Sequence, residues 1–185
     1  MAEVVLRTAR LELCRPGVSD APLVFAHLNS AAALEHLGGP KTLEQIEERL
    51  ARSVANFAAE GFCFLLIFEI GTGELVGHCG LKRVDAQGAR NPGDMEIGWL
   101  IREDRWRLGY AREAASAVLR HAFTDLAAPL VVALASDRNE ASWRLMDRLG
   151  MERTQELDFD DPDFGPEDNP TIVYRLTRQQ WDAAQ

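Results

Sequence analysis

The stretch from Arg105 to Phe123, which reads RWRLGYAREAASAVLRHAF, constrains the fold of this chain more than any other. Its apolar residues recur at spacings of three and four, as on one buried face of an α-helix: Ala111, Ala114, Ala115, Val118, Leu119, Ala122 and Phe123. Just before this helix, Gly109 can adopt backbone angles that a side chain would forbid, and the small Ala111 lets a ligand approach the main chain. The sequence therefore predicts a turn that exposes backbone N–H groups at a helix start.

Such a turn has two interpretations. Uncapped amides at a helix N-terminus, with the positive end of the helix dipole behind them, bind anions, and Arg105, Arg107 and Arg112 add positive charge. A pyrophosphate would suit that site. The alternative is an ordinary loop-to-helix junction, in which Gly109 relieves crowding and the arginines are solvated. These residues alone do not decide between the two.

Composition limits what the chain does. Its 185 residues, 46% of them hydrophobic, predict one compact domain over residues 1–185. The net charge of -9 and the pI near 4.9 argue against nucleic acid as the main partner, because phosphate backbones attract clustered Lys and Arg. Cys14, Cys63 and Cys79 form no Cys-x-x-Cys pair and the four histidines are scattered, so we expect neither disulfides nor a metal.

The location of the protein follows from what the sequence lacks. The N-terminus, MAEVVLRTARLEL, does not have the basic-then-apolar pattern of a signal peptide, and the longest apolar run, Phe62 to Phe68, is too short to span a bilayer. Unpaired cysteines indicate a reducing compartment. We therefore expect a soluble, unprocessed, cytoplasmic protein with no membrane partner.

Hydrophobic patterning predicts an α+β fold in three layers. A mixed central sheet of about six to seven strands is flanked by helices, and a local parallel pair joined by a crossover helix lies within residues 94–150. A capping box at Thr42 and Gln45 begins the longest of the early helices, and Gly61 ends it. The predicted strands are residues 10–15, 62–69, 75–84, 95–101, 130–135, 151–159 and 171–176, and the remaining helices start near residues 20 and 139.

No Gly-x-Gly-x-x-Gly or Gly-x-x-x-x-Gly-Lys-Ser/Thr fingerprint is present, which disfavours a Rossmann or kinase-like protein. Other motifs carry a resemblance. They are Trp106-Arg107-Leu108-Gly109-Tyr110-Ala111, Glu96-Ile97-Gly98-Trp99, Asn139-Glu140-Ala141-Ser142 and Arg148-Leu149-Gly150-Met151. Together they resemble the GNAT superfamily of acetyl-CoA-dependent N-acetyltransferases, in particular the subgroup with the ribosomal-protein N-terminal acetyltransferases. The likeness spans nearly the whole chain, from Arg10 onward, and implies a GNAT-like mixed sheet.

The resemblance implies a binding site for acetyl-CoA as cosubstrate. In that family the loop before the central helix reads Gln/Arg-x-x-Gly-x-Gly/Ala, which falls here on Trp106, Gly109 and Ala111. Trp106 departs from the superfamily pattern but is familiar in the subgroup, and the gripping groups are main-chain amides. The implied pyrophosphate donors are the amides of Arg107, Leu108, Gly109, Tyr110, Ala111 and Arg112. The family also splays the strand at Trp99 and Ile101 from its neighbour, so that the pantetheine arm pairs with exposed backbone.

Three residues are candidates for further roles. Glu96 is either a general base, acting directly or through water, or a solvent-facing strand carboxylate. The proton-donating tyrosine of many relatives is replaced by Met146, and Ser142 is the substitute acid, unless its hydroxyl only bonds its own helix backbone. Asn139 is a pantetheine contact, a helix N-cap, or both.

The resulting hypothesis is direct transfer of an acetyl group to a primary amine, without a covalent enzyme intermediate. The acceptor is a protein N-terminus or a small-molecule amine, and the protein is a monomer or homodimer. A catalytically weak acetyl-CoA-binding regulatory module is the alternative, because Met146 has no proton to give. The acidic segment Asp158 to Asp168 either borders the acceptor cleft, where it would attract a cationic amine, or is a solvated loop.

Overall fold

A computed structural model of the chain describes residues 3–184. These residues form two compact units. Unit 1 comprises residues up to 35, 39–82 and 98–118, whereas unit 2 comprises residues 36–38, 83–97 and those from 119 onward. The chain passes between the units more than once, and two strands and one helix contribute residues to both.

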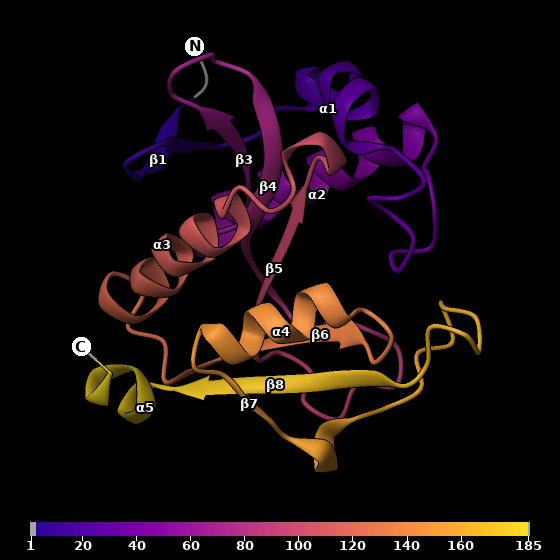
Figure 1. Cartoon of the computed structure of the whole chain (residues 1–185), viewed down its shortest axis with the longest axis vertical. Coiled ribbons are helices and arrows are strands. Elements are labelled where there is room, and N and C mark those ends of the chain that lie inside the picture. Colours follow the sequence, from indigo (N-terminus) through magenta and orange to yellow (C-terminus); the bar gives the residue numbers. More distant parts are fainter. Residues whose placement is uncertain (1–2, 185) are drawn as a thin grey trace. The chain divides into compact units, whose positions relative to one another are not determined.

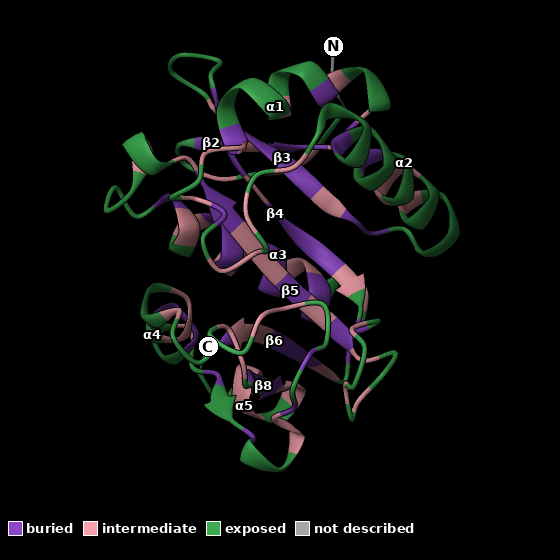
Figure 2. Cartoon of the chain, turned by 90° about the vertical axis from the view of Figure 1, so that its right-hand side faces the viewer, coloured by how far each residue is buried: buried purple, intermediate pink, exposed green. Residues whose placement is uncertain are grey.

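Unit 1 is built on antiparallel strands. They are β1 (Val4–Arg7), β2 (Leu11–Cys14), β3 (Phe64–Glu69) and most of β4 (Leu75–Arg83). Figure 2 shows β3 and β4 as largely buried ribbons. Leu11, Leu13, Ile67, Val76 and Leu81 are at most 1% exposed. The hairpin predicted from the apolar runs on either side of residues 71–73 is confirmed, because β3 and β4 pair from Phe64 opposite Gly80 onward.

Two helices complete the N-terminal part of unit 1. A 3₁₀ turn, η1 (Val18–Asp20), leads into α1 (Ala21–Leu28), and α2 (Leu43–Glu60) follows. The predicted capping box is confirmed: Thr42 Oγ1 accepts from the Gln45 amide at 3.2 Å, and Gln45 Oε1 accepts from the Thr42 amide at 2.9 Å. Gly61 ends α2 with φ of +80°. Ile46 and Leu50 of α2 pack against Ala21 of α1.

Both units share β5 (Met95–Ile101) and α3 (Tyr110–Thr124), which the 3₁₀ turn η2 (Glu103–Arg105) connects (Figure 1). The predicted apolar face of α3 is buried from Ala114 onward, and Ala111 is half-buried. In unit 1, the end of β5 lies very close to β4: the Arg102 amide donates to the Val76 carbonyl at 3.0 Å. A Cβ atom at Gly77 would lie 2.2 Å from the Leu100 carbonyl oxygen. Glycine is therefore required where β4 supports the end of β5.

Unit 2 contains the C-terminal elements. They are β6 (Leu130–Ser136), α4 (Glu140–Arg148), β7 (Glu152–Arg153), the 3₁₀ turn η3 (Gln155–Leu157), β8 (Thr171–Thr177) and α5 (Arg178–Ala183). β8 runs antiparallel to β6 along its whole length, and β5 pairs with β6 in parallel, with Glu96 opposite Val132. Val84, Val132, Phe159 and Val173 form a buried cluster in this unit.

Within residues 3–184 the strands make one mixed eight-stranded sheet in the order β1-β2-β3-β4-β5-β6-β8-β7. The predicted α+β class is confirmed, with slightly more strands than expected. In the part of the chain that the structure describes, none of the helices combines the length and the apolar character that crossing a membrane requires.

The predicted strand over residues 151–159 is confirmed only at Glu152–Arg153 and is wrong for the residues that follow. β7 is two residues long, the chain then turns at η3, and Phe159 makes only an isolated bridge with Thr171. The Asp158 carboxylate explains the interruption, because its Oδ1 accepts from the Val173 amide at 3.0 Å and takes the place of a neighbouring strand's carbonyl. Sequence reasoning also missed β1 and the six-residue α5, which are short elements near the chain ends.

Gly77→Ala tests the close approach of β4 and β5. The new methyl group meets a backbone oxygen that cannot move without disturbing the sheet, so we expect a loss of unfolding free energy of about 1–3 kcal/mol. Gly71→Ala is the matched control, because no heavy atom lies within 4 Å of its added Cβ. Urea unfolding of both variants measures the difference, and equal stabilities would contradict the packing described for this strand pair.

Candidate functional site

The entry loop, residues 102–109, joins β5 to α3 in unit 1 and has an unusual backbone. Arg107 has φ of +64° and Gly109 has φ of +84°. Glycine adopts this region freely, whereas a non-glycine residue there costs on the order of 1 kcal/mol. The surrounding contacts must therefore hold Arg107 in this conformation. Backbone of this kind turns successive N–H groups toward one side, as anion-binding loops do.

The backbone amides of the first three residues of α3, Tyr110 to Arg112, have no acceptor inside the helix. The Glu113 amide donates to the Gly109 carbonyl at 3.1 Å, which is the first hydrogen bond of the α3 ladder. The amides just before it are the orphan donors of a helix N-terminus, where the positive end of the helix dipole lies. The side chains of Arg107 and Arg112 are exposed beside them. This local geometry is suited to an anion.

Two aromatic residues, Trp106 and Tyr110, hold the entry loop in place through hydrogen bonds to neighbouring strands. The indole Nε1 of Trp106 donates to the Ile101 carbonyl at 2.8 Å. Tyr110 is 5% exposed, and its hydroxyl donates to the Glu69 carboxylate, which raises the pKa of Tyr110 and lowers that of Glu69. Only the main chain of Tyr110 is therefore available to a ligand. Ile101 was expected to contribute backbone to a pantetheine contact, and its carbonyl already accepts the hydrogen bond from Trp106.

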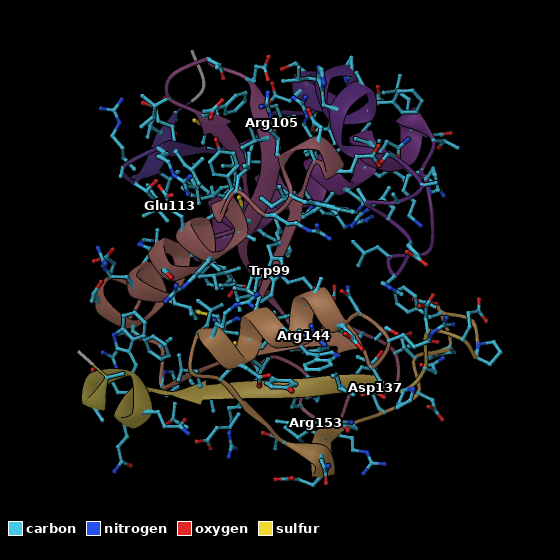
Figure 3. All side chains as sticks on the ribbon, viewed as in Figure 1. Trp99, Arg105, Glu113, Asp137, Arg144 and Arg153 are labelled. Carbon is cyan, nitrogen blue, oxygen red and sulfur yellow. The ribbon has the colours of Figure 1, made fainter. Side chains whose placement is uncertain are left out.

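Arg105 does not contribute a free charge to the entry loop. Its guanidinium pairs with Glu74, the residue just before β4, and Figure 3 labels the position of Arg105. Arg102 donates to the Leu75 carbonyl at 2.9 Å and to both carboxylate oxygens of Asp104, at 2.9 and 2.7 Å. The expectation that Arg105 adds positive charge for a phosphate is corrected: its charge is neutralised and serves to anchor the loop.

The N-terminal segment supplies further contacts that sequence reasoning missed. Glu113, on the first turn of α3 (Figure 3), accepts from Thr8 Oγ1 at 2.6 Å and from the Arg10 guanidinium Nε at 2.7 Å. Arg10 also donates to the Leu108 carbonyl at 2.9 Å. Arg10 and Glu113 are 103 residues apart, so no local spacing connects them. The family resemblance begins at Arg10, and that was the only available signal.

Glu96 lies in the unit 2 part of β5, opposite Val132 of β6. The residue is half-buried, and its Oε2 atom is shielded from solvent. The interpretation of Glu96 as a solvent-facing strand carboxylate therefore does not fit this oxygen. A shielded carboxylate at this position retains the chemistry of a base, and its catalytic role stays a prediction.

Asn139 and Ser142 lie together at the start of α4. Asn139 is the N-cap: its Oδ1 accepts from the Ser142 amide at 3.2 Å. Ser142 is half-buried, and among residues 3–184 its hydroxyl has no backbone hydrogen bond, so the cap uses its amide alone. Met146 is 1% exposed and belongs to the core. The hydroxyl of Ser142 thus remains available for other chemistry.

The acidic segment Asp158 to Asp168 is not uniformly solvated. Asp161 is 4% exposed, its Oδ1 accepts from the Asp163 amide at 3.0 Å, and Asn169 hydrogen-bonds to both its amide and its carbonyl. Asp168 hydrogen-bonds to His36 Nδ1 at 2.9 Å. The interpretation of a wholly solvated loop is therefore wrong for Asp161, whereas a role toward the acceptor stays a prediction. No group of three or more potential metal ligands occurs among the described residues.

The ionisation of Glu113 predicts a pH-dependent stability. Burial raises the pKa of this carboxyl, but hydrogen bonds from Thr8 and Arg10 outweigh burial and hold the pKa below its ordinary value of 4.5. A depressed pKa stabilises the fold above the ordinary value, and the stabilisation is lost as the pH falls through the folded-state pKa. Glu113→Gln lacks this contribution.

Melting temperatures of the wild type and Glu113→Gln, measured from pH 7 to pH 3, test this linkage. We expect the wild type to melt higher at pH 7 and the difference to shrink below about pH 4.5. A difference that stays constant across this range would mean that the Glu113 charge contributes nothing to the network.

Comparison with known proteins identifies the family. Residues 10–152, more than half of the chain, match the family described as "Acetyltransferase (GNAT) domain". The uncharacterized protein YkkB of Bacillus subtilis (strain 168) is 30% identical over 151 residues, which are 81% of this chain and 86% of YkkB. The crystal structure of an acetyltransferase from Agrobacterium tumefaciens str. C58 aligns with a TM-score of 0.75 and 29% identity, over 92% of each chain.

A ribosomal-protein acetyltransferase is also among the similar structures. RimL, the ribosomal L7/L12 α-N-protein acetyltransferase solved in complex with coenzyme A, aligns with a TM-score of 0.75 over 95% of this chain and 98% of RimL. At 15% identity this likeness shows the shared fold. Taken with the family match, these comparisons establish that the chain belongs to the GNAT family and is an acetyl-CoA-dependent acetyltransferase.

Proposed function

We propose that the protein transfers the acetyl group of acetyl-CoA directly to a primary amine, on a protein N-terminus or a small molecule, within one domain formed by residues 1–185. The entry loop carries this proposal. Arg107 and Gly109 have positive φ angles, and amides without acceptors follow at the start of α3. This geometry favours a pyrophosphate site over the alternative interpretation, an ordinary loop-to-helix junction. The family match extends over residues of both units, which supports a single catalytic domain.

The cofactor residues divide into donors for the phosphates and contacts for the pantetheine arm. The phosphate donors are the amides of Arg107, Leu108, Gly109, Tyr110, Ala111 and Arg112, and the exposed Arg107 and Arg112 side chains add charge. The backbone at Trp99 and the side-chain amide nitrogen of Asn139, whose Oδ1 caps α4, are the proposed pantetheine contacts. Because Trp106 occupies the Ile101 carbonyl, Ile101 contributes through its amide or its packing.

The chemistry needs one proton acceptor and one proton donor. The amine nitrogen attacks the thioester carbonyl carbon, a C–N bond forms, and the C–S bond breaks with release of the coenzyme A thiolate. Glu96 takes the proton that the attacking amine loses, directly or through water, and the Ser142 hydroxyl protonates the departing thiolate. Exchange with solvent then returns a proton to Ser142 and removes the one held by Glu96, so that the enzyme is restored. No step requires an acetylated enzyme residue.

Glu96→Gln tests the proposed base. The amide keeps the shape of the carboxylate but cannot accept the proton, so we expect turnover with a reactive amine to fall about 10²-fold while acetyl-CoA affinity is unchanged. The assay follows thiol release from acetyl-CoA with a panel of N-terminal peptides, small amines and aminoglycosides. Glu152→Gln, an exposed strand carboxylate of the same unit, is the control and should keep wild-type turnover.

The same assay distinguishes catalysis from binding. Ser142→Ala keeps the backbone amide that donates to the Asn139 cap, so its melting temperature should stay near that of the wild type. A lower rate would then report the loss of a proton donor. Full activity in Glu96→Gln would remove Glu96 from the mechanism. Acetyl-CoA binding by the wild type without turnover of any amine would favour a regulatory binding module, consistent with the buried Met146.

A further inference from the structure

We propose that Arg10 and Glu113 are positioning residues for the coenzyme A phosphates: together they orient the Leu108–Gly109 peptide and keep the α3 N-terminus free for an anion. This inference rests on the proposed function, because it assigns a purpose to contacts around the same entry loop. Neither residue needs to touch the cofactor. Both lie in unit 1, as do the entry loop and the first turns of α3.

The Leu108 carbonyl sets the direction of the Gly109 amide. In a trans peptide the C=O and the following N–H point in opposite directions. Arg10 Nη1 donates to the Leu108 oxygen at 2.9 Å, so the Gly109 N–H is directed away from Arg10. The Leu108–Gly109 peptide lies next to two residues with positive φ, Arg107 and Gly109, and this hydrogen bond restrains its orientation. Arg10 therefore fixes an amide that the proposed function needs as a phosphate donor.

Arg10 also contacts the residue on the other side of Gly109. Its guanidinium carbon lies 4.6 Å from the centroid of the Tyr110 ring, over the ring face. The Tyr110 hydroxyl is in turn bound to Glu69 of β3. A Cβ added at Gly109 would lie 3.4 Å from Arg10 Nη2. One guanidinium thus spans Leu108, Gly109 and Tyr110, which are three consecutive residues at the start of α3.

Glu113 would otherwise oppose anion binding. A carboxylate on the first turn of a helix interacts favourably with the free amides there, and its charge repels a phosphate. Both Glu113 oxygens are instead used by the N-terminal segment. Oε1 accepts from Thr8 Oγ1 at 2.6 Å and from the Arg10 amide at 3.0 Å, and Oε2 accepts from Arg10 Nε at 2.7 Å. The pairing neutralises the charge and turns the carboxylate away from the α3 amides.

The guanidinium fork explains why arginine is needed. Arg10 uses Nε and Nη2 toward Glu113 and Nη1 toward Leu108. A lysine ammonium has a single nitrogen on a flexible stem and cannot reproduce three directed donors in one plane. Arg10→Lys should therefore fail to orient the Leu108–Gly109 peptide even though it keeps the positive charge.

Isothermal calorimetry with coenzyme A and steady-state kinetics with acetyl-CoA test the proposal. We expect Arg10→Met and Arg10→Lys to raise the Kd for coenzyme A and the KM for acetyl-CoA about tenfold or more, with kcat within about twofold of the wild type. Glu113→Gln should give a smaller increase, because the amide oxygen still accepts hydrogen bonds. Arg7→Met is the matched control: Arg7 is an exposed arginine of the same N-terminal segment, pairs with Glu12 across β1 and β2, and should leave Kd, KM and kcat unchanged.

A second measurement does not depend on turnover. Arg107 is exposed within the entry loop, so trypsin cleavage after it reports whether the loop is held. Without ligand, cleavage should be faster in Arg10→Lys than in the wild type and Arg7→Met. Wild-type Kd and cleavage in the Arg10 variants would overturn the positioning role alone. If the wild type itself does not bind coenzyme A, the proposed function fails and the positioning role fails with it.

Discussion

The hydrogen bonds between the Glu113 carboxylate, Thr8 and Arg10 connect the N-terminal segment to the start of α3, and the geometry of the entry loop depends on them. Each bond has an ionised partner, and such bonds are stronger than neutral ones. They hold in place a backbone whose conformation at Arg107 is unfavourable by itself. Local strain at the loop is therefore stabilised by residues far away in the sequence.

The first half of the entry loop, from Arg102 to Trp106, is also held by hydrogen bonds and ion pairs. Arg102 and Arg105 bind the start of β4, and Trp106 returns to the last residue of β5. Gly77 lets β4 approach the β5 backbone closely enough for this arrangement. A site held in this way before the ligand arrives loses little entropy on binding, which favours affinity. Pre-organisation of the amides is the property that links the fold to the proposed cofactor chemistry.

Local sequence patterns predicted the elements whose signals are local. The capping box at Thr42, the central hairpin, β5 and the apolar face of α3 each follow from spacing within a few residues. The strand expected over residues 151–159 stops after Arg153, and further along the Asp158 side chain accepts a hydrogen bond from β8 in place of a strand carbonyl. Alternation of apolar and polar residues cannot reveal that a side-chain oxygen takes the place of a backbone carbonyl.

The candidate site was predicted only where its signals are local in the sequence. Gly109 and the helix start were visible in the sequence, but the partners of the loop arginines were not. Arg105 was expected near a phosphate and pairs with Glu74, whereas Arg10 was passed over and contacts Leu108. Asp161 looked solvated in an acidic run and is buried through bonds to Asn169 and Asp163. Pairings between distant residues arise from the fold and leave no spacing pattern.

The central claim is that the main-chain amides at the start of α3 bind the pyrophosphate of coenzyme A. The most direct test is a titration of the ¹⁵N-labelled protein, followed by two-dimensional amide NMR, with coenzyme A and separately with pantetheine, which lacks the phosphates. The account predicts large amide shifts for Leu108, Gly109, Tyr110 and Ala111 with coenzyme A and small ones with pantetheine. Saturating coenzyme A that leaves these amides unshifted, while others move, would contradict it.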